Sequence, residues 1–110
     1  MSIKINAIVP DPVDTDPDKY KVILENEQVR VFDYSDEPGD KTKMHHHRRF
    51  VLYALCPFKR KLTFDNGKSV EKEFKGGEVL WNDEQSHIGE NIGKTKTHVL
   101  IVELKELITK

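Results

Sequence analysis

Three histidines have the spacing expected of a metal site. His45 and His47 flank His46 just before the apolar run 50–55. Side chains at positions i and i+2 of a β-strand share a face, so His45 and His47 are predicted to point together while His46 points away. Two converging imidazoles suggest a metal ion, and His87 is the candidate for a third ligand. We therefore predict a metal site formed by His45, His47 and His87.

The residues that follow this pair suggest how a substrate is held. If the strand continues with a period of two, Arg49, Val51 and Tyr53 share the face of the metal pair. A guanidinium group can bind a carboxylate through two hydrogen bonds, so Arg49 is a candidate substrate-binding residue, the alternative being a surface arginine at a strand irregularity. Tyr53 either donates a hydrogen bond in the pocket or fills the core. Arg49 and Tyr53 are our predicted catalytic residues.

Five further residues have predicted roles at the site or in the core. Glu90 is a candidate fourth ligand, or a partner in a structural pair at the following turn. Glu90 and Asn91 are both candidates to orient a metal-bound imidazole, and Gln85 is a weaker candidate for a hydrogen bond in the pocket. Trp81 is predicted to lie in the core rather than to form a substrate platform. Cys56, the only cysteine, is predicted to be a buried structural thiol rather than a nucleophile.

Short β-rich segments separated by turns fill the chain from residue 20 onward, with no convincing amphipathic helix. The Asn66-Gly67 pair predicts a type I′ hairpin turn, because Asn-Gly tolerates the positive φ angles of both central positions. About nine short strands favour an all-β sandwich or barrel. The predicted strands are 20–25, 28–34, the histidine segment with 50–55, 60–65, 68–74, 78–82, 87–91 and 95–105.

The first 19 residues are predicted to form an arm outside this domain. Residues 3–9 form a possible short edge strand. The stretch 10–18 contains three prolines and four aspartates, which argue against a regular element. A solvated linker is favoured over a calcium loop, which would need a glycine and a terminal glutamate. We expect an arm over 1–19, crossing the surface or reaching a partner subunit, and one domain over 20–110.

Size and charge narrow the classes of partner. A chain of 110 residues fits one small domain. Lys and Arg number 18 and Asp and Glu 19, for a net charge of −1, which gives no electrostatic reason to expect nucleic acid or a membrane surface as partner. No apolar run approaches the roughly 20 residues needed to span a bilayer, and no signal pattern opens the chain. We expect a cytoplasmic protein.

The glycine and histidine spacings resemble the two metal-binding motifs of the cupins, which are double-stranded β-helix (jelly-roll) barrels. The matching positions are Gly39, His45 and His47 in the first motif and Gly76, His87 and Asn91 in the second, with Asn82 and Glu84 where Pro and Gly are usual. The resemblance covers roughly residues 20–105. Among cupins the chain is similar to the small single-domain group named for β-alanine degradation (BauB-like). The segments that carry this likeness are 20–22, 25–26, 29–31, 53–55, 89–91 and 102–105.

One departure from the cupin pattern concerns the ligand set. The first motif places a glutamate at position 51 or 52, where this chain has Val51 and Leu52. A set of three neutral histidines leaves the charge of a divalent ion uncompensated, which favours an anionic substrate or hydroxide in the open positions. Similar three-histidine cupins include thiol and diketone dioxygenases that use iron(II). The resemblance thus implies one divalent metal ion, with iron(II) favoured and zinc, nickel, manganese or copper also compatible.

The resemblance implies a dioxygenase-like enzyme acting on a small carboxylate, thiol or diketone. Two alternatives stay open: a non-catalytic cupin that senses a small molecule, and a metal-free structural cupin. A homodimer is expected, because small barrels expose sheet edges and apolar faces that pairing would cover.

Overall fold

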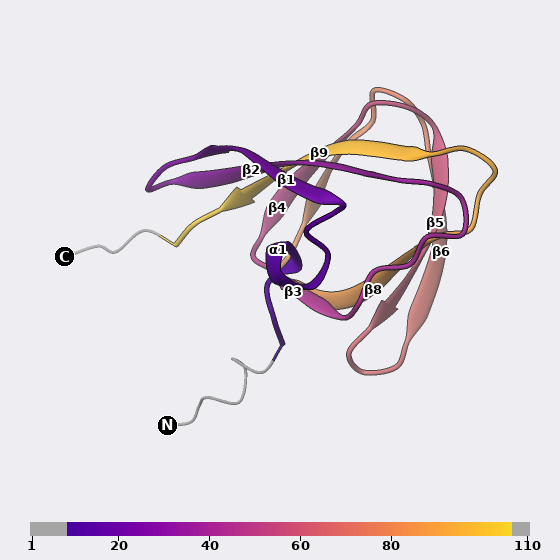
Figure 1. Ribbon diagram of the computed structural model, residues 1–110, viewed down its shortest axis with the longest axis horizontal. Helices are drawn as coiled ribbons and strands as arrows, with labels where there is room; N and C mark the ends of the chain where they lie inside the picture. The colour runs from indigo at the N-terminus through magenta and orange to yellow at the C-terminus, as the bar shows by residue number, and fades with distance from the viewer. Residues whose placement is uncertain (1–8, 107–110) are drawn as a thin grey trace.

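Two antiparallel sheets face each other in the computed structural model, which describes residues 9–106 (Figure 1). One sheet has the strand order β1-β2-β9-β4-β7 and the other β3-β8-β5-β6. The elements are α1 (Pro12–Thr15), β1 (Tyr20–Glu25), β2 (Val29–Asp36), β3 (His45–His47), β4 (Phe50–Ala54), β5 (Phe58–Phe64), β6 (Ser69–Phe74), β7 (Val79–Asn82), β8 (Gln85–Asn91) and β9 (Thr97–Leu104). The predicted all-β double-stranded β-helix is confirmed.

Strand β9 shows how the sequence defines an inner and an outer face. Along Thr97–Leu104, buried and half-buried residues alternate without interruption. Successive side chains of a strand point to opposite faces, so Val99, Ile101 and Glu103 face the interior while Leu100 and Val102 face outward. This strand lies at the centre of the five-stranded sheet, between β2 and β4. Its register therefore decides which residues of its neighbours face the barrel interior.

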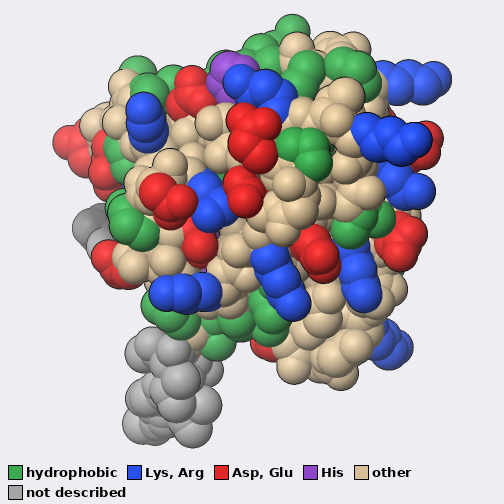
Figure 2. All heavy atoms as spheres, turned by 45° about the vertical axis from the view of Figure 1, so that its right-hand side comes forward, with side chains coloured by type: hydrophobic (Ala, Val, Ile, Leu, Met, Phe, Trp, Pro, Cys, Tyr) green, Lys and Arg blue, Asp and Glu red, His purple; other side chains and the backbone are tan. Residues whose placement is uncertain are grey.

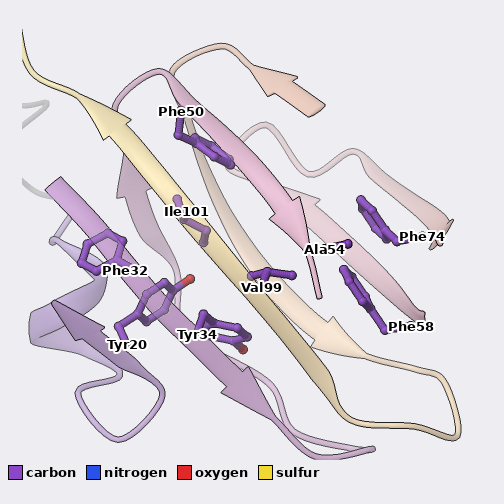
Figure 3. Close-up of a cluster of buried hydrophobic side chains, with 9 residues drawn as sticks. All are labelled: Tyr20, Phe32, Tyr34, Phe50, Ala54, Phe58, Phe74, Val99 and Ile101. Carbon is purple, nitrogen blue, oxygen red and sulfur yellow. The ribbon is translucent and has the colours of Figure 1, made fainter. Parts of the chain in front are cut away.

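The core lies between the two sheets and is mainly aromatic (Figure 3). Tyr20 packs against Phe32 and Tyr34, with ring centroids 5.2 and 4.6 Å apart. At the other end Phe58 and Phe74 stack with their centroids 4.4 Å apart. Such aromatic pairs contribute about 0.5–1.5 kcal/mol each beyond their buried area. The core leaves one end of the barrel, where β3 and β8 lie, lined by histidines.

The prediction that residues 10–18 form no regular element is wrong, because α1 lies within them. Asp11 caps this one-turn helix, its carboxylate accepting a hydrogen bond from the Val13 amide at 3.0 Å. Pro12 occupies the first turn, where the missing N–H costs nothing. The described part of the arm contacts β3, because the His46 amide donates to the Pro10 carbonyl at 2.9 Å. The predicted strand over 3–9 lies almost wholly outside the described residues.

The predicted hairpin at Asn66-Gly67 forms between β5 and β6, with a longer loop than expected. The Gly67 amide donates to the Phe64 carbonyl and the Phe64 amide to the Lys68 carbonyl, which is the pattern of a three-residue loop. Gly67 has φ of 89°, so it supplies the left-handed conformation that ends such a loop. The sequence signal identified the turn but not its type.

Charges of both signs are interspersed on the side of the molecule that carries β5 and β6 (Figure 2). Across this hairpin Lys59 faces Glu73 and Lys61 faces Glu71. Directly opposed charges of this kind stabilise an antiparallel pair modestly. Within residues 9–106 no helix has the length and apolar character to cross a membrane.

Candidate metal centre

The three predicted histidines meet at one wall of the barrel. Strand β3 pairs with β8 so that His45 lies directly opposite His87, while the alternation along β3 turns His47 to the same side. One ring nitrogen from each residue lies within 4.8 Å of the other two. His45, His47 and His87 are at most 6% exposed. His46 points away, and its ring bonds Ser86 and Glu84 at 2.7 Å each.

The Nδ1 atom of each of these three histidines is held by an oxygen that can only accept a hydrogen bond. The amide nitrogen of Gln85 donates to the Asp83 carbonyl, so the Gln85 side-chain oxygen is the atom turned toward His87. Each Nδ1 therefore carries the proton, and each Nε2 keeps its lone pair for the site. The acceptors for His45, His47 and His87 are the Lys43 carbonyl (2.8 Å), the Glu103 carboxylate (2.8 Å) and the Gln85 amide oxygen (2.7 Å).

The electrostatics of the site favour neutral imidazoles. Burial lowers the pKa of His45, and it lowers the pKa of His47 and His87 well below the ordinary value. All three rings are therefore unprotonated on Nε2 at neutral pH, which is the form that binds a metal. Three buried nitrogen lone pairs directed to one point fit a divalent ion, and imidazole suits zinc, copper, iron and nickel.

Metal-free protein is expected to lose stability as the pH falls below 6.5, the ordinary value for histidine. Because burial lowers the pKa of these three histidines in the folded state, the unfolded chain binds more protons than the folded chain over this pH range. The full free energy of unfolding is present above pH 6.5. It declines as the pH falls from 6.5 toward the lower pKa values of the histidines in the folded state. Urea unfolding of chelator-treated protein on either side of pH 6.5 measures this dependence. A flat profile would contradict the buried neutral state of the three rings.

Glu103 is a functional residue that the sequence analysis missed. Its carboxylate is 1% exposed and accepts from His47 Nδ1, while its second oxygen accepts from Arg30 at 2.8 Å. Arg30 also donates to Asp11 at 2.7 Å. Burial raises the pKa of Glu103, and the guanidinium of Arg30 opposes this rise. A charged residue at an interior-facing position of β9 was the signal that could have identified it.

Replacing Glu103 with alanine is expected to weaken metal binding roughly 10- to 100-fold, the usual effect of losing a carboxylate that orients a ligating imidazole. Zinc affinity measured by competition with a chromophoric chelator tests this. The matched control is Asp33→Ala, which removes a carboxylate that is bonded to a different histidine, His98, at 2.9 Å. Equal affinities in Glu103→Ala and Asp33→Ala would show that His47 needs no orienting partner.

The prediction that Arg49 and Tyr53 share the face of His45 and His47 is wrong. Arg48 and Arg49 form a bend between β3 and β4, so the chain passes from one sheet to the other and the alternation restarts. Tyr53 is 40% exposed on the outer face of β4. Arg49 is exposed and lines a separate polar groove with Glu27 and Lys105. Neither residue lies where it could touch a molecule at the histidines.

The remaining candidates also differ from the expected positions. Glu90 lies opposite Lys61 on the outward side of β8, away from the histidines. Asn91 is buried, yet its amide donates to Asp36 and to the Thr95 carbonyl rather than orienting an imidazole. Trp81, predicted in the core, is 53% exposed. Cys56 is half-buried, with its thiol 3.5 Å from the Lys96 carbonyl.

A cavity of about 220 Å³ opens at the three histidines and runs into the barrel. We call it the histidine cavity. Phe50 and Leu52 line it from β4, so one of the two positions where a cupin glutamate is expected faces the site as leucine. Most ligand pockets enclose about 300–1,000 Å³, so this one suits a small molecule. Its wall is mainly apolar, and its polar members besides the histidines are Tyr20, Tyr34, Arg60, Lys72, Asn82, Gln85 and Thr97.

Arg60 is a buried cation in the wall of the histidine cavity, and its partners hold it fixed. One of its terminal nitrogens donates to Asp36 at 2.8 Å and to Thr97 at 3.1 Å, and the other donates to the Tyr34 hydroxyl at 3.2 Å. Gly89 makes room for it, because a Cβ there would lie 2.6 Å from the guanidinium. The Asp36 carboxylate is fully buried beside this guanidinium. The opposite charges of Arg60 and Asp36 therefore offset each other within the wall.

The fold is that of solved cupin structures. A cupin domain from Bordetella pertussis is 22% identical to this chain and superposes with a TM-score of 0.73. The alignment covers 96% of this chain and 100% of the Bordetella chain. An RmlC-like double-stranded β-helix cupin from Methanocaldococcus jannaschii is 13% identical, with coverages of 94% and 87% and a TM-score of 0.63. No family model and no curated protein matches the sequence. This chain thus has the double-stranded β-helix fold of these cupin structures, with three histidines grouped as a candidate metal centre.

Proposed function

We propose that this protein is a cytoplasmic metalloenzyme, dioxygenase-like, that holds one divalent ion through His45, His47 and His87. The observation that carries the proposal is the convergence of three Nε2 lone pairs whose Nδ1 atoms are all engaged. Iron(II) is the favoured ion, following the resemblance to three-histidine dioxygenases. When bound, such an ion supplies Lewis acidity and access to redox chemistry with dioxygen.

The substrate class follows from charge and space. Three neutral nitrogens leave the ion's positive charge to be balanced by another group, which favours a carboxylate, a thiolate or the enolate form of a diketone. The apolar wall formed by residues such as Phe58, Leu62 and Phe74 suits a short hydrocarbon part. A cavity of about 220 Å³ limits the substrate to a small metabolite.

The test begins with elemental analysis of protein purified without a nickel column, beside a His45→Ala, His47→Ala double variant. Near-stoichiometric iron that is lost in the variant, followed by dioxygen consumption with small thiols or diketones, would support the proposal. Stoichiometric zinc would direct attention to hydrolysis or isomerisation. Tight ligand binding without turnover would favour a sensor. Absence of metal, with both proteins equally stable, would leave a structural module.

We also propose that the protein is a homodimer. An apolar row crosses the outer face of all five strands of the larger sheet: Leu24, Val31, Val102, Val51 and Trp81. Tyr53, Leu100 and Val79 form a shorter row beside it. A second copy presents the same surface, so a two-fold pairing would cover both patches. Light scattering should give a dimer for the wild type and for Thr63→Glu on the other sheet, and a monomer for Trp81→Glu. A wild-type monomer would contradict the proposal.

A further inference from the structure

The histidine cluster has no carboxylate among its candidate ligands, and a tyrosine hydroxyl lies beside it. Among the described residues, the group of side chains placed to hold a metal contains histidines alone. The hydroxyl of Tyr20 lies 3.2 Å from Nε2 of His45 and 3.4 Å from Nε2 of His47, two of the three atoms left free for a metal. Tyr20 is the first residue of β1, twenty-five residues before His45, so no local motif connects it with the histidines.

These two distances match the separation between ligands of one ion. With metal–nitrogen and metal–oxygen bonds of about 2.0–2.1 Å, neighbouring ligand atoms lie about 2.9–3.4 Å apart, depending on the coordination geometry. Both oxygen–nitrogen distances of Tyr20 fall within or at the edge of this range. We infer that Tyr20 is the fourth protein ligand and supplies the anionic oxygen that the missing glutamate would supply. This inference rests on the proposed metal site.

The surroundings hold Tyr20 in this position. Its ring packs edge-on against Phe32 and lies 5.6 and 5.9 Å from the rings of His45 and His47. Its backbone amide donates to the Asp16 carbonyl at 3.1 Å, which ties the start of β1 to the end of the arm. The side chain is 6% exposed, so solvent competes little for its hydroxyl. Fixed geometry of this kind is what a ligand position requires.

The proton balance of this step is simple. In metal-free protein the hydroxyl keeps its proton and donates it in a hydrogen bond to a histidine Nε2. A bound cation reverses this preference, as it does for coordinated thiols and water. The oxygen–metal bond forms, the O–H bond breaks, and the proton passes to bulk water. One phenolate would reduce the net charge of a divalent site to +1.

Visible and resonance Raman spectroscopy of iron-loaded protein, oxidised to the ferric state, tests the inference. Phenolate bound to ferric iron gives a charge-transfer band that histidine does not give. The chain contains three tyrosines, so Tyr34→Phe and Tyr53→Phe are matched controls. Tyr34 packs against Tyr20, but its hydroxyl bonds Asp36 and Arg60. We expect the band in the wild type and in both controls and its loss in Tyr20→Phe, with zinc affinity lowered roughly 10-fold or more.

The outcomes separate this inference from the function on which it rests. Wild-type protein that binds iron through the histidines without the band, or a Tyr20→Phe variant that keeps the band, would overturn the role of Tyr20 alone. Wild-type protein that binds neither iron nor zinc would overturn the metal site and this inference with it. If Tyr20→Phe does not fold, the two controls take its place: a band that both Tyr34→Phe and Tyr53→Phe retain must come from Tyr20, the third tyrosine.

Discussion

His47→Ala and His87→Ala are each expected to lose most of the bound metal, with affinity falling by roughly 100-fold or more. Removing a residue that only orients a ligand costs about 10- to 100-fold, so removing the ligand itself should cost at least the upper end. Both rings present Nε2 to the same point, and both have Nδ1 engaged elsewhere. Elemental analysis and chelator competition would measure the loss directly.

His46→Ala is the matched control for these variants. His46 lies between the two ligands of β3, and its ring faces outward to Ser86 and Glu84. Its metal content should equal that of the wild type. Equal losses in the variants at positions 46, 47 and 87 would contradict the alternating strand and would instead indicate a general disturbance of β3.

Arg60→Ala is expected to destabilise the fold by about 3–5 kcal/mol, the usual consequence of removing one partner of a buried ion pair. The Asp36 carboxylate that remains is fully buried, and among residues 9–106 only the Tyr34 hydroxyl and the Asn91 amide would still donate to it. The free energy of unfolding from urea titration measures the effect. Such a loss would be a large part of the stability of a domain of this size.

Two further variants show whether the isolated charge causes this loss. Lys61→Ala removes the neighbouring cation on the outer side of β5 and should change the free energy of unfolding by less than about 0.5 kcal/mol. The double variant Arg60→Met, Asp36→Leu removes both charges and should recover much of the loss, because apolar replacement of a buried pair is often neutral. If the double variant is as unstable as Arg60→Ala, packing rather than charge explains the effect.

The strands and the histidine site were predictable because they depend on short-range periodicity. Alternation places His45 and His47 together, and β-rich runs bounded by glycine and proline define the other strands. The alternation fails where the chain changes sheet. The bend at Arg48 and Arg49 shifts the inward-facing positions by one residue. Tyr53 therefore faces outward and Leu52 inward. A bend of two residues has no repeating pattern of apolar and polar residues, so the sequence does not reveal it.

The residues that surround the histidines were missed for a different reason. Tyr20 and Glu103 reach the site from strands far away in the sequence, through pairings that periodicity does not specify. Glu103 carried a signal, because it continues the interior-facing series of Val99 and Ile101. Tyr20 carried none, since an aromatic residue at a strand start is ordinary core composition. Local spacing brings His45 and His47 together, whereas strand topology brings Tyr20 and Glu103 to them.

The position of the arm against β3 also bears on aggregation. Strand β3 lies at the edge of the four-stranded sheet, with β8 on one side only. An uncovered edge strand is a template for pairing with other chains. Pro10 accepts a hydrogen bond from the free side of β3 at His46, and the Asp16 carboxylate accepts another from the Lys43 amide (Figure 1). By occupying these groups, Pro10 and Asp16 should disfavour pairing of the histidine strand with a second molecule, so residues outside the barrel would limit its aggregation.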